Sequence, residues 1–301
     1  MNLRRVLPRF ALGCFLFDLL LVPYSAHAKD RVTILYDAFS ESKEVTKDWG
    51  FSALIEHDGK LILFDAGNNA EIFQHKHNVK SLGVDLSKLD FVVISHRHSD
   101  HTTGLKYLVE MNPTVPIYVA RESFGMFGGI VPPTIIHPVP ALPSRMRYFD
   151  GNVPSNVPTG NVFRAGNFVL VDKLTEVAPG ISLVPTVSKN TGTLELRELT
   201  LAIKGKQGLI LVDGCSHAGI EEILQAASAV DPHFHIIFGG LHLVTTPESE
   251  IDVLVANLKD KWKLDKIAPG HCTGEPAFLR LQQAFGDNYL YAGAGTRIDV
   301  L

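Results

Sequence analysis

The sequence predicts a layered α/β protein, and three features of its 301 residues support that prediction. Short runs of β-branched and apolar residues alternate with stretches of helical periodicity. Both kinds of segment occur in each half of the chain, which favours one large domain at 29–301 over two unrelated ones. The composition is 46% hydrophobic and 20% charged, as in globular proteins and unlike disordered chains.

Strands in the first half are expected where β-branched and apolar residues cluster. Residues 31–37 alternate in polarity, and 91–94 form a continuous apolar run typical of a buried strand. The runs 51–56 and 60–64 flank an Asp-Gly pair, which predicts a hairpin. Two helices and one more strand complete this half, at 69–82, 103–111 and 116–120.

Regular structure resumes beyond residue 167. The same patterns predict strands at 168–172, 181–187, 194–204, 208–213, 235–238, 266–268 and 290–292. Helices are expected at 218–229, 248–261 and 277–285.

Residues 121–166 have a different composition. Seven of the 17 prolines fall in this segment, together with six glycines. Long irregular segments of this kind are often functional lids or linkers. We interpret it as an irregular insertion over the active face, and a surface excursion without a role remains the alternative.

The first 28 residues have the layout of a secretory signal peptide. Arg4, Arg5 and Arg9 precede an apolar stretch at 10–22, and Ala26-His27-Ala28 places small residues around a cleavage point. We therefore expect cleavage after Ala28, export to the periplasm or medium, and no stable membrane association afterwards. An uncleaved membrane anchor is the alternative, although the apolar stretch is short for a span.

Charge and cysteine content exclude several classes of protein. The formal net charge is −4, and the leader contributes +2, which leaves −6 for the mature chain. No run of Lys or Arg interrupts this acidic balance, which argues against nucleic acid as a partner. Three cysteines are too few for a disulfide scaffold. A bound divalent cation would offset part of the negative charge.

The sharpest motif is Ser95-His96-Arg97-His98-Ser99-Asp100-His101, which lies between an expected strand and an expected helix. Alternation in an extended segment places His96 and His98 on one side, so that Asp100 and His101 can face a second ion. Imidazole and carboxylate groups suit Zn²⁺, Fe²⁺ or Mn²⁺. A cluster of surface histidines is the alternative, but the strand leads this segment directly out of the core.

These residues resemble the metallo-β-lactamase superfamily. His96, His98, Asp100 and His101 match its HxHxDH signature, Asp65 in LILFDAG matches its first motif, and His271 in PGHCTG matches its last. The resemblance covers nearly all of the mature chain and implies a four-layer αββα sandwich with a metal site at one edge of the two sheets. It also implies that Asp65 orients the HxHxDH loop by hydrogen bonds and does not itself bind metal.

Three later segments resemble one branch of the superfamily. They are GCSHAGI at 214–220, GGLHL at 239–243 and HCTG at 271–274. Members of that branch are described as metal-dependent hydrolases, and some as a dihydropterin–ribofuranosyl-aminobenzene-phosphate synthase. The resemblance does not fix the substrate, and β-lactam hydrolysis is not expected from the superfamily name.

The chain departs from the superfamily pattern at one ligand. Residues 183–190 (LVPTVSKN) lack the mid-chain histidine of many members, and the bridging aspartate is replaced within 212–217. His217, Cys215 or Asp213 must then complete the ligand set. We favour His217, because it leaves a strand on a loop that opens a helix, with Cys215 as the second choice.

The remaining polar candidates are weaker. His242 follows two glycines after a strand and suits proton donation, substrate contact or metal binding, with a loop histidine as the alternative. Cys272 is expected to be a buried spectator thiol, although it could pair with Cys215 or bind substrate. Thr273 and Gly274 are possible donors to a substrate anion. The other histidines are expected to be solvated, namely His75, His77, His137, His233 and His235.

Together these features predict a metallo-hydrolase. One or two divalent transition-metal ions, most simply Zn²⁺, would activate water for attack on a small ester, lactone or phosphoester. Asp100 would orient the nucleophile, and His242 would stabilise the oxyanion or protonate the leaving group. The alternatives are a synthase of pterin-type metabolism and a non-enzymatic metal- or ligand-binding module. The sequence does not indicate the oligomeric state.

Overall fold

The computed structural model describes residues 30–68, 74–122 and 165–300, together with 129, 130, 140, 152, 158 and 159. The expected signal peptide, most of the 121–166 insertion and His137 lie outside the described residues. Within these ranges, no helix combines the length and the apolar composition needed to cross a bilayer.

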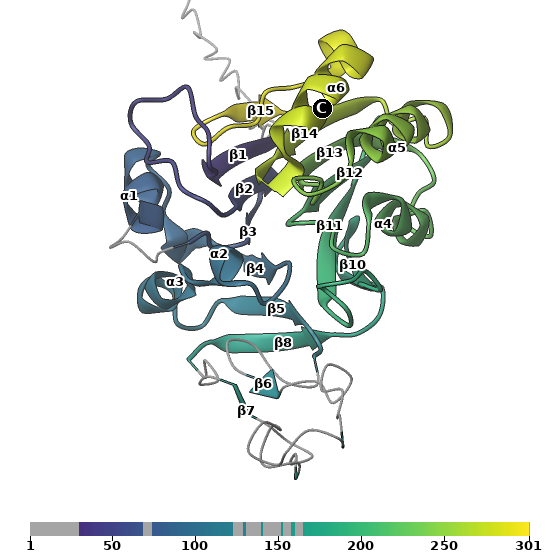
Figure 1. Cartoon of the computed structure of the whole chain (residues 1–301). Coiled ribbons are helices and arrows are strands. Elements are labelled where there is room, and N and C mark those ends of the chain that lie inside the picture. The colour runs from purple at the N-terminus through teal and green to yellow at the C-terminus, as the bar shows by residue number, and fades with distance from the viewer. Residues whose placement is uncertain are drawn as a thin grey trace, which may run out of the picture.

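Two β-sheets face each other, and helices cover the outer face of each (Figure 1). In the described part of the chain, the first sheet has the strand order β15-β1-β2-β3-β4-β5-β8. Its strands are β1 (Arg31–Tyr36), β2 (Ser52–His57), β3 (Lys60–Phe64), β4 (Phe91–Ile94), β5 (Pro116–Ala120), β8 (Asn167–Val171) and β15 (Arg297–Asp299). A separate two-stranded ribbon pairs β6 (Gly129–Ile130) with β7 (Pro158–Thr159).

The second sheet has the order β14-β13-β12-β11-β10-β9. Its strands are β9 (Thr175–Ala178), β10 (Ile181–Val187), β11 (Arg197–Gly205), β12 (Gly208–Asp213), β13 (Phe234–Gly240) and β14 (Lys266–Gly270). The α-helices are α1 (Gln74–Ser81), α2 (Ser99–Thr102), α3 (Leu105–Met111), α4 (Ile220–Ala227), α5 (Glu248–Asp260) and α6 (Glu275–Phe285).

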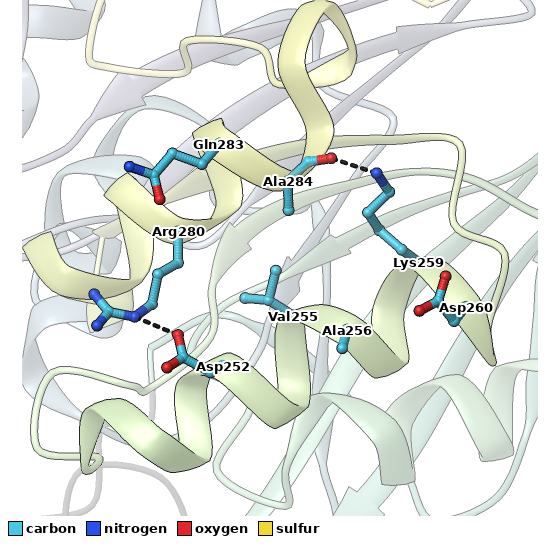
Figure 2. A pocket seen from close by; sticks show the side chains of 8 residues that line it. All are labelled: Asp252, Val255, Ala256, Lys259, Asp260, Arg280, Gln283 and Ala284. Atoms are coloured by element: carbon cyan, nitrogen blue, oxygen red, sulfur yellow. Dashed lines mark hydrogen bonds and ion pairs between the residues drawn. The ribbon is translucent and has the colours of Figure 1, made fainter.

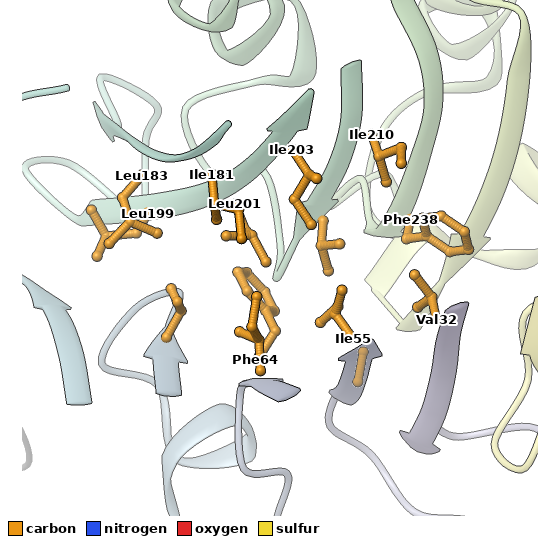
Figure 3. Close-up of a cluster of buried hydrophobic side chains, with 14 of the residues drawn as sticks. Val32, Ile55, Phe64, Ile181, Leu183, Leu199, Leu201, Ile203, Ile210 and Phe238 are labelled. Atoms are coloured by element: carbon orange, nitrogen blue, oxygen red, sulfur yellow. The ribbon is translucent and has the colours of Figure 1, made fainter. Parts of the chain in front are cut away.

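Alternation along the strands divides the apolar side chains into three buried layers. On β3, Phe64 points toward the second sheet, where it meets Leu201 of β11 (Figure 3). The neighbouring Leu63 packs on the opposite face of the strand. The outer face of the first sheet packs against α1 and α3, and that of the second sheet against α4, α5 and α6. The expected αββα sandwich is therefore confirmed.

Both sheets contain parallel strands whose carboxyl ends carry the polar motifs. Strands β3, β4, β5 and β8 run parallel in the first sheet, and β12, β13 and β14 in the second. The expected hairpin joins β2 to β3, and its Asp58 and Gly59 both have positive φ, as a type I′ turn requires.

Several expected elements differ from the structure. The expected helix at 103–111 begins two residues later, as α3, and the four-residue α2 precedes it within the histidine motif. Gly104 lies in the turn between them, where a Cβ would overlap the Ala66 carbonyl oxygen. The expected strand at 290–292 does not form, and an isolated bridge pairs the preceding Tyr289 with Ile267. Strands β9 and β15 are additional, and both are short, polar edge strands without the apolar run that predicts a strand.

Two of the histidines expected to be solvated are buried, so that expectation was wrong. His75 lies on the same face of α1 as the buried Val79, four residues later. His235 lies on β13, which is buried along its whole length, and its Nδ1 lies 3.1 Å from Asp265 Oδ2. His77 and His233 are exposed, as expected.

Burial of His75 predicts a specific sensitivity to acid. Burial lowers the pKa of His75 to about 4, so this side chain stays neutral in the folded protein while its unfolded counterpart, with a pKa near 6.5, takes up a proton. Stability is therefore lost as the pH falls from 6.5 toward 4, by at most about 3 kcal/mol from this residue. Urea unfolding of His75→Gln in EDTA should show a smaller loss between pH 7 and pH 4 than the parent protein. Equal losses would contradict this assignment.

Candidate metal centre

The predicted site residues follow the carboxyl ends of parallel strands in both sheets. Asp65 follows β3, and the motif 95–101 follows β4. In the second sheet, the segment 214–217 follows β12, His242 comes after β13, and His271 comes directly after β14. Because carboxyl ends of parallel strands meet at one edge of a sheet, each sheet presents its motif residues at a single edge.

A first group of candidate ligands contains His96, His98 and His217. His96 Nε2 lies 3.0 Å from His98 Nδ1, and the ring of His217 lies 4.8 Å from each of the other two rings, centroid to centroid. Both ring nitrogens of His217 are buried without a hydrogen-bond partner. Three imidazoles from two sheets therefore face one another.

A second group contains Asp100, His101 and His271. Asp100 Oδ2 lies 3.6 Å from His101 Nε2 and 3.4 Å from His271 Nε2. His271 is buried, its Nδ1 has no hydrogen-bond partner, and the contact of its Nε2 with Asp100 falls outside hydrogen-bond geometry. This group adjoins the first, since the rings of His96 and His101 are 4.2 Å apart.

Cys215 lies between the two groups. Its Sγ is 3.3 Å from His101 Nε2, and the side chain is a buried free thiol. Asp213, the third residue considered for completing the ligand set, points elsewhere, because its carboxylate accepts hydrogen bonds from Thr200 and Ser216. The structure thus brings both His217 and Cys215 to the centre and leaves Asp213 out.

Asp65 contacts the ligand loop and not the centre itself. Its carboxylate accepts hydrogen bonds from the Ser95 amide and the Ser95 hydroxyl, each at 2.7 Å, and lies 2.7 Å from His101 Nδ1. These contacts fix the ring of His101 with Nε2 facing the centre. This geometry fits the role that the superfamily resemblance implied for Asp65, which is to orient the HxHxDH loop by hydrogen bonds.

Electrostatics keep several of these imidazoles neutral. Burial and the neighbouring histidines lower the pKa of His96 well below its usual value, that of His98 to about 4 and that of His217 to about 2. A neutral imidazole has a free lone pair, which is the form that binds metal. The unpartnered nitrogens and the mixed imidazole, carboxylate and thiol donors together fit a divalent transition-metal ion.

Backbone strain is concentrated at the same place. Asp65, Ser216, His242 and His271 all have φ between 44° and 59°, a region that non-glycine residues seldom adopt. Each of these residues lies just beyond a strand of the metal centre. Strained conformations of this kind persist where the surrounding structure holds them, and they often mark functional sites.

His242 lies beside the first ligand group. Its ring is 4.1 Å from that of His217, and its Nδ1 is buried without a hydrogen-bond partner. A hydrogen bond with Cys272 raises the pKa of His242.

Thr273 is not available to a substrate anion, because its hydroxyl donates to the Gly270 carbonyl oxygen and accepts from the Leu241 amide.

Three site neighbours were missed by the sequence analysis. Asp37 is buried and accepts a 2.8 Å hydrogen bond from the His271 amide, and burial raises its pKa to about 8. Glu198 is buried with Oε1 3.6 Å from His96 Nδ1. Trp49 is 46% exposed, and its ring lies 5.1 Å from that of His271.

Two of these residues carried a sequence signal. Asp37 follows β1 just as Asp65 follows β3, and Glu198 interrupts the largely apolar strand β11. Trp49 had none, because its place beside His271 depends on the loop that joins β1 to β2. That loop is attached to the ligand motif through a hydrogen bond from the Phe51 amide to the Asp100 carbonyl.

A shallow groove between α5 and α6 is a separate feature (Figure 2). Arg280 bridges it by an ion pair with Asp252, and Lys259 donates to the Ala284 carbonyl oxygen. It has no histidine or cysteine among its lining residues, which are Asp252, Val255, Ala256, Lys259, Asp260, Arg280, Gln283 and Ala284. The groove therefore offers carboxylates but neither of the imidazole and thiol ligand types found at the sheet edges.

Comparison with known proteins establishes the family. A family model of the metallo-β-lactamase superfamily matches residues 47–193. A synthase of Methanocaldococcus jannaschii, 7,8-dihydropterin-6-methyl-4-(β-D-ribofuranosyl)-aminobenzene-5'-phosphate synthase, is 30% identical over 264 residues, which cover 81% of this chain and 88% of the synthase. The chain belongs to the metallo-β-lactamase superfamily.

Solved structures of the superfamily share the fold. The crystal structure of Tm1679, described as a metal-dependent hydrolase of the β-lactamase superfamily, has a TM-score of 0.67 at 24% identity and covers 90% of this chain and 99% of its own. The metallo-β-lactamase fold protein YhfI from Bacillus subtilis has a TM-score of 0.54 at 13% identity, with the same coverage. The superfamily binds divalent metals, which agrees with the donors gathered here.

Proposed function

We propose that this protein is a metal-dependent hydrolase that cleaves an ester, lactone or phosphoester bond in a small molecule. One observation carries the proposal. The imidazole rings of His217 and His271 are buried and lack hydrogen-bond partners, and they lie against the HxHxDH motif. The two histidines follow strands of the second sheet, whereas the motif follows a strand of the first. A buried polar group without a partner destabilises the fold, and a metal ion is the partner that fits these nitrogen, oxygen and sulfur atoms.

The proposed ligands form two groups, so we propose two ions. His96, His98 and His217 would hold one ion, and Asp100, His101 and His271 the other, with Zn²⁺ favoured by the nitrogen and sulfur donors and Fe or Mn as alternatives. When bound, such ions lower the pKa of water from about 15.7 toward about 7 and polarise an oxygen of the substrate.

The side chains around the centre have distinct proposed roles. Asp100, with 18% of its side chain exposed, orients the nucleophile through its carboxylate. His242, whose half-buried ring lies 4.1 Å from that of His217, is placed to donate a proton to the leaving group. Trp49 supplies an exposed aromatic face beside His271, where it can contact an apolar part of the substrate.

A synthase of pterin-type metabolism is the second candidate, and the relative from Methanocaldococcus jannaschii favours it. Such chemistry would use the same centre. We also propose that the protein acts after export, on the strength of its leader sequence, and export argues against a cytoplasmic pterin pathway.

Metal removal and a substrate panel test the proposal. The purified protein should contain about two transition-metal ions per chain and hydrolyse at least one ester, lactone or phosphodiester. Dialysis against a chelator should abolish that turnover, and adding Zn²⁺ back should restore it. A metal-loaded protein that is inert on the panel but binds a pterin or an aryl phosphate would favour the synthase instead.

A further inference from the structure

The position of Cys215 allows one step beyond the proposed function. Two clusters of potential ligand atoms, each with all of its members within 4.8 Å of one another, share this residue. One cluster joins Cys215 to His96 and His217, and the other joins it to His101 and His271. Cys215 is thus the common member of the two proposed metal positions.

We infer that the Cys215 sulfur bridges two metal ions as a thiolate, in the place where many superfamily members use an aspartate. This inference rests on the proposed metal centre and deepens it. The one aspartate in 212–217 is Asp213, and its carboxylate accepts hydrogen bonds from Thr200 and Ser216. The sulfur, in contrast, is buried and only 3.3 Å from His101 Nε2.

The unpartnered imidazoles provide independent support. His217 is 2% exposed and His271 is 3% exposed, and the ring nitrogens of both lack hydrogen bonds. One belongs to each cluster, so the unsatisfied groups lie on both sides of the Cys215 sulfur. Metal binding would release the thiol proton to solvent, and the resulting thiolate would bond to both ions.

A bridging thiolate has a consequence for metal preference. Sulfur is a softer ligand than a carboxylate oxygen and favours Zn²⁺ and similar ions over Mn²⁺. A carboxylate in place of the Cys215 sulfur should shift the preference of the site toward Mn²⁺. Cys215→Asp is therefore expected to weaken Zn²⁺ binding relative to Mn²⁺ binding by at least about tenfold.

A competing arrangement uses the second cysteine. Cys215, His242 and Cys272 form a third cluster of potential ligands. An ion held there would have both cysteine sulfurs as ligands, and the Cys215 sulfur would bind that one ion without bridging to a second. Cys272, 2% exposed, is thus a matched control, because it is an equally buried thiol beside the same centre.

Cobalt substitution tests the bridge without an activity assay. Metal-free parent protein is titrated with Co²⁺ while its near-ultraviolet sulfur-to-cobalt charge-transfer band is recorded. The band should grow through both equivalents, disappear in Cys215→Ser, and persist in Cys272→Ser. Cys215→Ser should also bind the second equivalent at least about tenfold more weakly, and circular dichroism checks that each variant is folded.

Each other outcome overturns the inference in a recognisable way. A band that saturates after one equivalent means a terminal thiolate, and a band lost in Cys272→Ser means that the third cluster holds the ion. No Co²⁺ binding by the parent protein would overturn both the bridge and the proposed centre. The expected titration in a protein that hydrolyses nothing on the panel would support the bridge while contradicting the hydrolase.

Discussion

Replacing His98 by alanine is expected to remove metal and turnover together. His98 Nδ1 lies 3.0 Å from His96 Nε2 and faces His217, so its loss leaves the first ligand group with two imidazoles. The ions of such centres contribute several kcal/mol of transition-state stabilisation, and about 4 kcal/mol corresponds to roughly a thousandfold in rate. Metal content by elemental analysis and kcat/KM on the best panel substrate should fall in parallel.

An exposed histidine provides the control. His77→Ala removes the same kind of side chain from the surface of α1, where alanine is a good helix former. This variant should keep the metal content and the turnover of the parent and change the free energy of unfolding by about 0.5 kcal/mol or less. Full metal occupancy and full turnover in His98→Ala would show that His98 is not a ligand.

The sequence was most informative where the chemistry is concentrated in a short segment. The residues from His96 to His101 lie within six positions and follow an apolar strand, so their convergence on one point could be predicted from the short motif itself. His217 was favoured because it leaves β12 as the motif leaves β4, and the structure places it against His96. The alternation of strands and helices predicted a layered α/β domain, and the resemblance to the metallo-β-lactamase superfamily implied the αββα sandwich.

Contacts between distant residues were beyond that reasoning. Asp37 reaches His271 across 234 residues of sequence, and Glu198 reaches His96 from the other sheet. Whether a loop turns Cys215 or Asp213 toward the centre depends on the backbone after β12, where Ser216 takes an unusual positive φ. No local pattern specifies such a turn.

The buried histidines show a different limit. His75 and His77 are two residues apart on a helix, which correctly implies that they face different directions. That spacing does not say which of the two faces the sheet, and the structure buries His75 while His77 stays exposed. The direction was decided by the packing of α1 on the first sheet, with Val79 on the same face.

Asp65→Asn is expected to weaken metal binding at the second proposed position, that of Asp100, His101 and His271. Asp65 is not itself a proposed ligand, and the effect comes from its hydrogen bond to His101. Asp65 Oδ2 lies 2.7 Å from His101 Nδ1, so the carboxylate oxygen accepts the proton on Nδ1 and turns Nε2 toward Asp100. An asparagine that presents its amide nitrogen to His101 donates a hydrogen bond instead, which favours the tautomer with its proton on Nε2. That proton would block the second metal position, and the affinity for the second ion should fall about ten- to hundredfold.

The choice of asparagine separates this effect from a general loss of stability. Asp65 has φ of 57°, and asparagine tolerates that conformation about as well as aspartate, whereas alanine does not. Asp65→Ala also leaves the buried Ser95 amide without its acceptor, at about 1–3 kcal/mol, and removes one of the two partners of the Ser95 hydroxyl, whose other partner is His96 Nδ1. We therefore expect Asp65→Ala to lower the free energy of urea unfolding strongly in the metal-free protein. Asp65→Asn should retain most of that stability but titrate with a weakened second equivalent of Zn²⁺ in calorimetry. If instead both variants bound two equivalents as tightly as the parent, the carboxylate of Asp65 would not be what orients His101.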